Sequence, residues 1–329
     1  MKSGPPRWRW HEAIQALTAR RVRFAASAVG SFWWEAGAIV QRALAGSAFE
    51  LELQTNTTDH RNVRAVASGD CEIGVTMPPY VDWANRRFGL LQGASGPELV
   101  VIAAFNQPVW LAAAIDRSTG ISSLREVAQR KYPWRPVMFA ADLLLGVYLD
   151  RLLELHGLSR ELLREWGGGD MLPMRRPAAS EPAPAVRVMK HLTRELALNG
   201  DTDGFFLYTG WTVQWLRDLT SILDLRFLTF DEAALDTVVR EFGGEKLTLP
   251  ARLFPGADDD QLAIGWRHQY VYGTAETDAD LVTAVLHGLE ASRDQLLFNS
   301  QALSYYPCAP ALIPGVRLHP AAANYYADR

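Results

Sequence analysis

The sequence predicts an α/β protein of two lobes, each a doubly wound sheet with flanking helices, and a ligand cleft between the lobes. Apolar runs of strand length alternate with helical stretches along most of the 329 residues, which are enough for about two domains. Repeated βα units favour an open doubly wound sheet. Two near-continuous apolar runs, 99–105 and 109–115, are separated by only three residues, as expected for a strand pair that crosses between lobes.

The individual elements follow from periodicity and from breakers. Strands are expected where short runs are apolar or alternate with polar residues, and helices where apolar residues recur at a spacing of three or four. Leu281, Val285 and Leu289 form such a stripe, and Gly157 marks the end of a long helix. The predicted strands are 23–28, 50–54, 73–76, 99–105, 109–115, 136–140, 204–208, 226–230 and 262–272. The predicted helices are 35–45, 59–68, 123–129, 144–156, 186–196, 212–219, 231–242 and 278–298.

The lobes are expected to be discontinuous in sequence. A hinge at Asn106–Pro108 and a second crossing near 227–230 would assign 1–107 and 229–329 to lobe 1 and 108–228 to lobe 2. Residues 167–185 interrupt the βα pattern with glycines, prolines and mixed charge, so we expect a flexible loop there.

Composition excludes several classes of protein. A formal net charge of −4 and a hydrophobic fraction of 48% describe a globular protein without the basic field of a nucleic-acid binder. Cys71 and Cys308 are too few for a zinc cluster, and two buried free thiols are favoured over one disulfide. Asp258, Asp259 and Asp260 lack the spacing of a calcium loop, so we expect a solvated acidic turn. We therefore expect no cofactor and no metal.

The first thirty residues show an amphipathic helix rather than a secretory signal, because Trp10, Ile14 and Leu17 recur among polar residues. No stretch is apolar over the about 18 residues that a membrane span needs. Two locations follow as alternatives. The protein is cytoplasmic if Met1 is native, and periplasmic if a leader has been removed and replaced by Met1.

Six segments, taken together, resemble the TAXI-type solute-binding subunits of TRAP transporters. The C-terminal LHPAAANYYADR (318–329) is similar to the family's His-Pro-small-small-x-x-Tyr-Tyr ending, and the resemblance extends from about residue 21 to the end. The other segments, in the family's order, are VGSFWWEAG (29–37), SGDCEIG (68–74), GISSL (120–124), TDGFF (202–206) and FPG (254–256). The resemblance implies a type II periplasmic-binding-protein-like fold and a ligand pocket between the lobes.

The residues of that pocket are implied by the same resemblance. Three loops and the start of one helix would supply them, and backbone N–H groups at helix starts suit a carboxylate. The implied ligand-binding residues are Ser31, Phe32, Trp33, Trp34, Thr57, Thr58, His60, Leu144, Tyr208, Gly210 and Trp211.

The sequence departs from the family before the long helix, where 141–146 reads ADLLLG instead of a Gly/Ser/Thr-rich loop. Leucines and the indoles of Trp33 and Trp34 predict a ligand larger or more apolar than a glutamate-sized dicarboxylate, although both indoles are equally expected in the core. Four further aromatic residues are expected in the core: Tyr80, Trp83, Trp110 and Tyr148.

Two functions follow. In the first, the chain captures a small organic acid, or a partly aromatic small molecule, for a TRAP-type transporter or as a sensor. In the second, it is a cytoplasmic enzyme of the same fold that acts on a small carboxylate, for example as a decarboxylase or lyase. Standard catalytic motifs are absent from the sequence, so the enzyme hypothesis depends on His60 as a general base beside Asp59. An exposed loop histidine is the favoured interpretation of His60.

Overall fold

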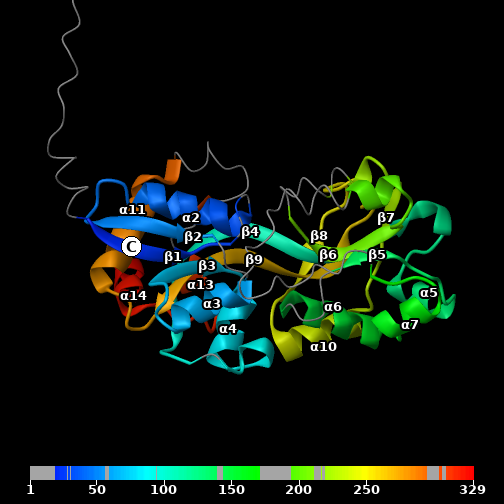
Figure 1. Cartoon of the computed structure of the whole chain (residues 1–329), viewed down its shortest axis with the longest axis horizontal. Helices are drawn as coiled ribbons and strands as arrows, with labels where there is room; N and C mark the ends of the chain where they lie inside the picture. The colour runs from blue at the N-terminus through cyan, green and yellow to red at the C-terminus, as the bar shows by residue number, and fades with distance from the viewer. Residues whose placement is uncertain are drawn as a thin grey trace, which may run out of the picture.

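The protein is an elongated α/β molecule whose two halves are joined by two long strands, β4 and β9 (Figure 1). The computed structural model describes residues 19–27, 29, 31–55, 59–93, 95–138, 144–170, 194–210, 216, 219–294, 304–305 and 309–329. The expected helix around Trp10, most of the 167–185 loop and Cys308 lie outside these residues. A mixed α/β fold with a large sheet and flanking helices confirms the predicted fold class.

The described strands form one sheet in the order β2-β1-β3-β9-β4-β6-β5. β10 and β7 pair with β4 outside this path, and β8 pairs with β9. β1, β2 and β3 are parallel to one another on one half, β3 is antiparallel to β9, and β5 is parallel to β6 on the other half. The strands are β1 (Arg20–Ala25), β2 (Phe49–Gln54), β3 (Ile73–Thr76), β4 (Leu99–Asp116), β5 (Pro136–Met138), β6 (Gly204–Gly210), β7 (Leu225–Phe227), β8 (Glu245–Leu249), β9 (Gln261–Thr274) and β10 (Ser304–Tyr305).

Helices cover both faces of this sheet (Figure 1). α2 packs against α11, whose Gly288 approaches so closely that an added Cβ would lie 2.1 Å from the Ala43 carbonyl oxygen. The described helices of four or more residues are α2 (Phe32–Ala43), α3 (Asp59–Ala67), α4 (Pro78–Asn85), α5 (Leu124–Gln129), α6 (Leu144–Leu155), α7 (Arg160–Glu165), α10 (Glu232–Phe242), α11 (Ala279–Ala291), α13 (Ala309–Leu312) and α14 (Pro320–Ala327). None of these helices is long and apolar enough to span a membrane.

β4 corrects one sequence-based expectation. The two apolar runs are not separate strands, because β4 continues through Asn106–Pro108 as one strand of 18 residues. It pairs antiparallel with β9 on one side and with β6 on the other. A register shift between Asn106 and Val109 absorbs the extra residue as a bulge, which also accommodates a proline without a backbone N–H.

The second long strand is β9, and the expectation of a crossing near 227–230 is wrong. Phe227 ends β7, a strand of three residues that pairs with Ala114–Asp116 at the far end of β4. Three residues span only about 10 Å, which is too short to cross between halves. β9 has 14 residues and pairs with β3, β4 and β8. The lobe boundaries and the hinge at Asn106–Pro108 stay predictions.

α4 was hidden in the sequence by its own prolines. Pro78 and Pro79 look like breakers, but they occupy the first helical positions, where the missing N–H would have no intrahelical partner. Tyr80, Trp83, Trp110 and Tyr148 are each less than 5% exposed, which confirms that they belong to the core.

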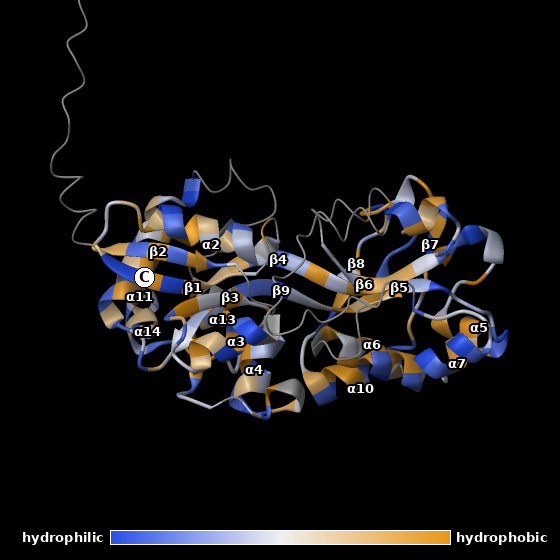
Figure 2. Ribbon diagram, viewed as in Figure 1, coloured by the Kyte–Doolittle hydropathy of each residue, from blue (hydrophilic) through white to orange (hydrophobic). Residues whose placement is uncertain are grey.

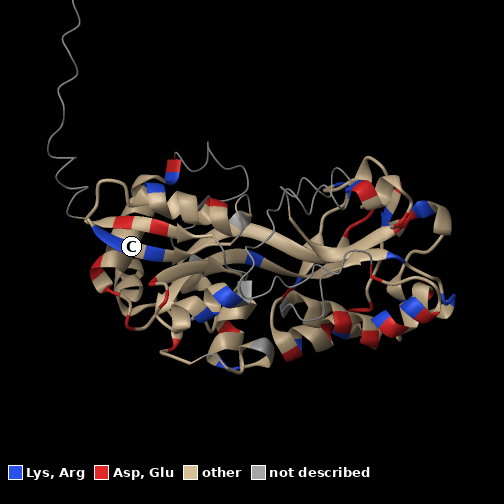
Figure 3. Cartoon of the chain, viewed as in Figure 1, with Lys and Arg blue, Asp and Glu red and all other residues tan. Residues whose placement is uncertain are grey.

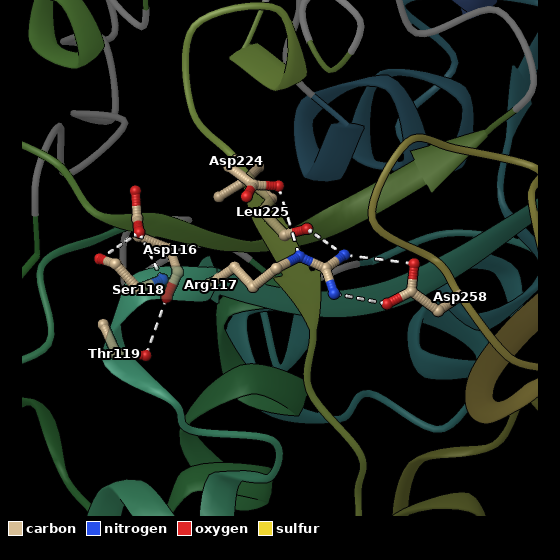
Figure 4. Close-up of polar contacts among 7 residues, drawn as sticks. All are labelled: Asp116, Arg117, Ser118, Thr119, Asp224, Leu225 and Asp258. Atoms are coloured by element: carbon tan, nitrogen blue, oxygen red, sulfur yellow. Dashed lines mark hydrogen bonds and ion pairs between the residues drawn. The ribbon is translucent and has the colours of Figure 1, made fainter.

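Charged residues lie mostly on the outer faces of the helices and at strand ends (Figure 3). One group of charged residues forms ion pairs at the far end of β4. Arg117 donates to both oxygens of Asp258, at 2.8 and 3.2 Å, and to Asp224 at 3.3 Å (Figure 4). The guanidinium holds the pKa of the Asp258 carboxyl below its usual value. Asp258 therefore acts as an ion-pair partner, as its exposed side chain allows.

Cys71 is buried, and this environment lowers the reactivity of its thiol. Its thiol is 3% exposed, and burial raises its pKa to about 12. A rise of this size leaves roughly a thousandfold less thiolate at pH 8, and the thiolate is the nucleophile. We expect iodoacetamide to leave Cys71 unmodified in the folded protein at pH 8 and to modify it in urea, as read by peptide mass mapping. Rapid modification of Cys71 in the folded chain would contradict this assignment.

Candidate functional site

The first contributor to the candidate site is the start of α2. Ser31 is the N-cap, and its hydroxyl accepts a hydrogen bond from the backbone N–H of Trp34 at 3.2 Å. The indole Nε1 of Trp33 donates to the side-chain Oε1 of Gln269 on β9, at 3.2 Å, and Trp33 is 6% exposed. Trp34 is half-buried. Trp33 therefore belongs to the core and also connects α2 with the long strand β9.

Strand register places two uncharged polar side chains, Gln269 and Thr209, on the same face of the sheet, and Gln107 lies in the bulge of β4 beside them. Gln269 pairs with Phe105, and Gln107 follows Phe105 by two residues. Beyond the bulge, Trp266 pairs with Val109 on the opposite face, so that Trp110 and its partner Thr209 on β6 return to the face of Gln269. The middle of β9 is accordingly hydrophilic between more apolar ends (Figure 2). The hydrogen bond from Trp33 on α2 to Gln269 shows that α2 covers this face.

Gln107 and Thr209 are buried without a hydrogen-bond partner among the residues that the structure describes. Gln107 is 3% exposed, and neither its amide nitrogen nor its amide oxygen has a hydrogen bond. The hydroxyl of Thr209, which is 0% exposed, is also unpartnered. Each such group costs about 1–3 kcal/mol when it is left unsatisfied. A bound molecule that supplied a donor and acceptors here would remove that cost, so Gln107 and Thr209 mark the candidate binding site.

A second polar pair lies at the carboxyl end of β3. Asn62, in the first turn of α3, and Thr76, the last residue of β3, are both fully buried, and their side-chain polar atoms have no partners. Thr76 pairs with Tyr270, so it points to the face of β9 opposite Gln269. The carboxyl end of β3 therefore offers the hydroxyl of Thr76 on the face opposite Gln269, and ligands of parallel strands bind beyond such ends.

The remaining residues expected in the site fall into two groups. Tyr208 is half-buried on β6 opposite Leu111, and Gly210 ends β6 opposite Val109, so both lie beside Thr209. The structure thus places Trp33, Tyr208 and Gly210 near the crossing strands. Thr57, Thr58 and Trp211 lie outside the described residues, as do the side chains of Phe32, Asp59, His60 and Leu144.

Two helix starts agree with the sequence-based prediction. α3 begins at Asp59 and α6 at Leu144, each directly after a segment outside the description. The roles of Asp59 and His60 in catalysis stay untested. In the described part of the chain, no three His, Cys, Asp or Glu residues gather as a metal site would require. His319 caps α14 through Ala321 N–H and contacts the Thr277 carbonyl oxygen at 2.9 Å, as expected for a residue that fixes the C-terminal turn.

Sequence reasoning missed the residues on which the candidate site now depends: Asn62, Thr76, Gln107, Thr209 and Gln269. A signal for one of them was present. Gln107 lies with Asn106 and Pro108 between two apolar runs and has a side chain that can both donate and accept, but the sequence indicated only a hinge there. Neutral amides and hydroxyls can orient a polar ligand without proton transfer, so this arrangement suits binding.

Comparison with known proteins gives the fold. No protein-family model matches the chain, and no curated protein sequence does. Among solved structures, the chain is similar to MatC from Rhodopseudomonas palustris with bound malate, at a TM-score of 0.51 and 12% identity over 94% of this chain and 96% of that chain. The chain has the type II periplasmic-binding-protein-like fold.

Two further structures of this group are similar at lower scores. PhnD1 from Prochlorococcus marinus, in complex with methylphosphonate, has a TM-score of 0.49 and 8% identity over 87% of this chain and 92% of that chain. The periplasmic aliphatic sulphonate binding protein SsuA from Escherichia coli has a TM-score of 0.44 and 13% identity over 94% of this chain and 79% of that chain.

Proposed function

We propose that the chain is a solute-binding protein that captures a small organic molecule between its two halves, at the middle of β4 and β9. The observation that carries the proposal is a pair of buried polar side chains without a hydrogen-bond partner among the described residues: Gln107 in the bulge of β4, and Thr209 on the face that α2 covers. The type II binding-protein-like fold supports it, because ligands of such sheets bind beyond the carboxyl ends of the strands.

The proposed ligand has a polar head and a partly apolar body. The amides of Gln107 and Gln269 and the hydroxyl of Thr209 would contact the head, and Trp34, half-buried at the start of α2, would contact the body. A carboxylate is the proposed head group, because amide N–H groups and the free backbone N–H groups at a helix start both donate to it. The malate bound to MatC supports a small organic acid.

Delivery to a TRAP-type transporter, or a role as a sensor, is the proposed biological setting. It depends on the resemblance of the six sequence segments to TAXI-type subunits. The residues between Asn106 and Val109 would act as the hinge, since a bulge interrupts the ladder there and lets the two halves rotate.

The substitution Thr209→Val tests the site directly. Without ligand, it should raise the free energy of unfolding by about 1 kcal/mol, because it removes a buried hydroxyl that has no partner and keeps the side-chain shape. It should also weaken binding of the best organic acid at least fivefold. Ligands are found by thermal shift over mono- and dicarboxylates, aromatic acids and sulfonates, and affinities are measured by calorimetry.

Thr202→Val is the matched control. Thr202 is 2% exposed, and its hydroxyl donates to the Arg135 carbonyl oxygen at 2.7 Å, so the same substitution should lower stability and leave affinity unchanged. A loss of stability in both variants, or an unchanged affinity in Thr209→Val, would remove Thr209 from the site. Mass spectrometry of each acid after incubation tests the enzyme hypothesis, since a pure binding protein returns every acid intact.

A further inference from the structure

A cavity lies on the face of β9 opposite Gln269. It has a volume of about 780 Å³ and lies between α4, the start of β8 and residues 312–317. Trp266, His268 and Tyr270 line it from β9 and alternate with Gln269, which points to the other face. Its volume lies within the range of about 300–1,000 Å³ that is typical of small-molecule sites.

Two buried polar atoms in this cavity have no hydrogen-bond partner. The indole Nε1 of Trp266 is unpartnered although the residue is only 1% exposed, and Nδ1 of His268 is unpartnered as well. Gly244 lies close to the indole N–H, since a Cβ there would lie 3.1 Å from Nε1. Trp266 and His268 are two residues apart on one strand, so one small head group can reach both.

The rest of the cavity is apolar at its walls and electrically balanced at its rim. Val81, Leu99 and Val316 contribute aliphatic surface. Three arginines line the rim, and each is paired with an acidic residue that also lines it: Asp82 with Arg86, Glu98 with Arg317, and Glu245 with Arg267. Burial lowers the pKa of His268, which keeps the imidazole neutral at pH 7. The cavity therefore offers a charged ligand no unpaired counter-ion among these residues.

We infer that this cavity is a second small-molecule site, selective for a neutral ligand with an apolar body and a primary carboxamide head. The carboxamide oxygen accepts from the Trp266 indole N–H. Its NH₂ group donates to Nδ1 of His268, or its oxygen accepts from Nδ1 in the other tautomer. Because Thr209 and Gln269 lie on the other face, this site is separate from the proposed solute site.

The test is a fluorine NMR titration of the full chain with 4-fluorobenzamide as the probe. We expect saturable binding, with 4-fluorobenzoate at least tenfold weaker because its charge must be desolvated without a free counter-ion. Trp266→Phe should weaken 4-fluorobenzamide binding at least fivefold, since it keeps an aromatic ring and removes the donor. Failure of 4-fluorobenzamide to bind, or equal affinity for the two probes, would overturn the inference.

Trp134→Phe is the matched control. Trp134 is also fully buried with an unpartnered indole nitrogen, but it packs against Phe206 and does not line the cavity. It should leave 4-fluorobenzamide binding unchanged, and so should Thr209→Val, which changes the proposed solute site. If Trp266→Phe lowers the folded fraction, Ile313→Trp replaces it as the test. Ile313 is a half-buried residue of the cavity wall, so the larger side chain narrows the cavity and should weaken binding. Weakening by Thr209→Val instead would place the probe in the solute site and overturn the inference.

Discussion

Trp83→Ala is expected to lower the free energy of unfolding by about 3–5 kcal/mol, the usual cost of truncating a buried tryptophan. Trp83 lies on α4, is 1% exposed and stacks on Tyr148 of α6 with ring centroids 5.5 Å apart. Its indole Nε1 donates to the carbonyl oxygen of Phe242 at 2.9 Å, and the Tyr148 hydroxyl donates to the same oxygen at 2.6 Å. These contacts join α4, in one half of the molecule, to α6 and α10, which both lie in the other half (Figure 1).

Trp83→Phe separates packing from the hydrogen bond. It keeps an aromatic ring against Tyr148 and removes the indole donor together with part of the ring, so we expect a smaller loss of about 1–2 kcal/mol. Urea unfolding followed by circular dichroism measures both variants. A loss below about 1 kcal/mol for Trp83→Ala would mean that this aromatic cluster does not hold α4 against α6 and α10.

Arg160→Met is expected to destabilise the fold by about 3 kcal/mol. Arg160 is the first residue of α7, is 6% exposed, and donates to Asp150 at 2.5 Å and to Asp170 at 2.6 Å. Asp170 is largely buried, so removal of the arginine leaves an uncompensated carboxylate. Arg164→Met, on the same helix, is the matched control, because Arg164 is exposed and pairs only with exposed Glu161. We expect a change below about 0.5 kcal/mol there.

The loss in Arg160→Met should depend on pH. Burial raises the pKa of Asp150 above its usual value even with Arg160 beside it, and Arg160 opposes that rise. Without Arg160 the pKa of Asp150 rises further. A carboxyl whose pKa is higher in the folded than in the unfolded state destabilises the fold increasingly as pH rises above the unfolded value. The variant should therefore lose less stability at pH 4 than at pH 8, and a loss that is equal at both values would contradict the ion-pair explanation.

Local patterns were sufficient for most of the elements. Residues 73–76 were predicted as a strand with the bounds that β3 has, and α3 and α6 begin at the predicted Asp59 and Leu144. Such elements depend on periodicity and on nearby breakers, which a single sequence contains. α4 was not predicted because a proline breaks a helix in its interior but is favoured in its first turn, and Pro78 and Pro79 look like breakers in the sequence alone.

The candidate site was only partly accessible to sequence reasoning. The resemblance to TAXI-type proteins indicated Trp33, Tyr208 and Gly210, which lie on α2 and β6 beside the crossing strands. It did not indicate Gln107 or Thr209, because an amide or a hydroxyl is common in any sequence and has no distinctive spacing. What distinguishes them is burial without a partner, a property that arises when strands from distant parts of the chain pair.

The sequence by itself determined the α/β class, the order of most strands and helices, and the two-part architecture, because alternation and breakers act over a few residues. Tertiary structure alone decided that β4 runs unbroken through Pro108 and that β9 is the second crossing strand. It also decided that Thr209 and Gln269 share one face and that Gln107 lies in the bulge of β4. The physical reason is that strand register and the bulge are set by hydrogen bonds between segments far apart in the sequence, and a change of one residue in register would turn each side chain to the other face.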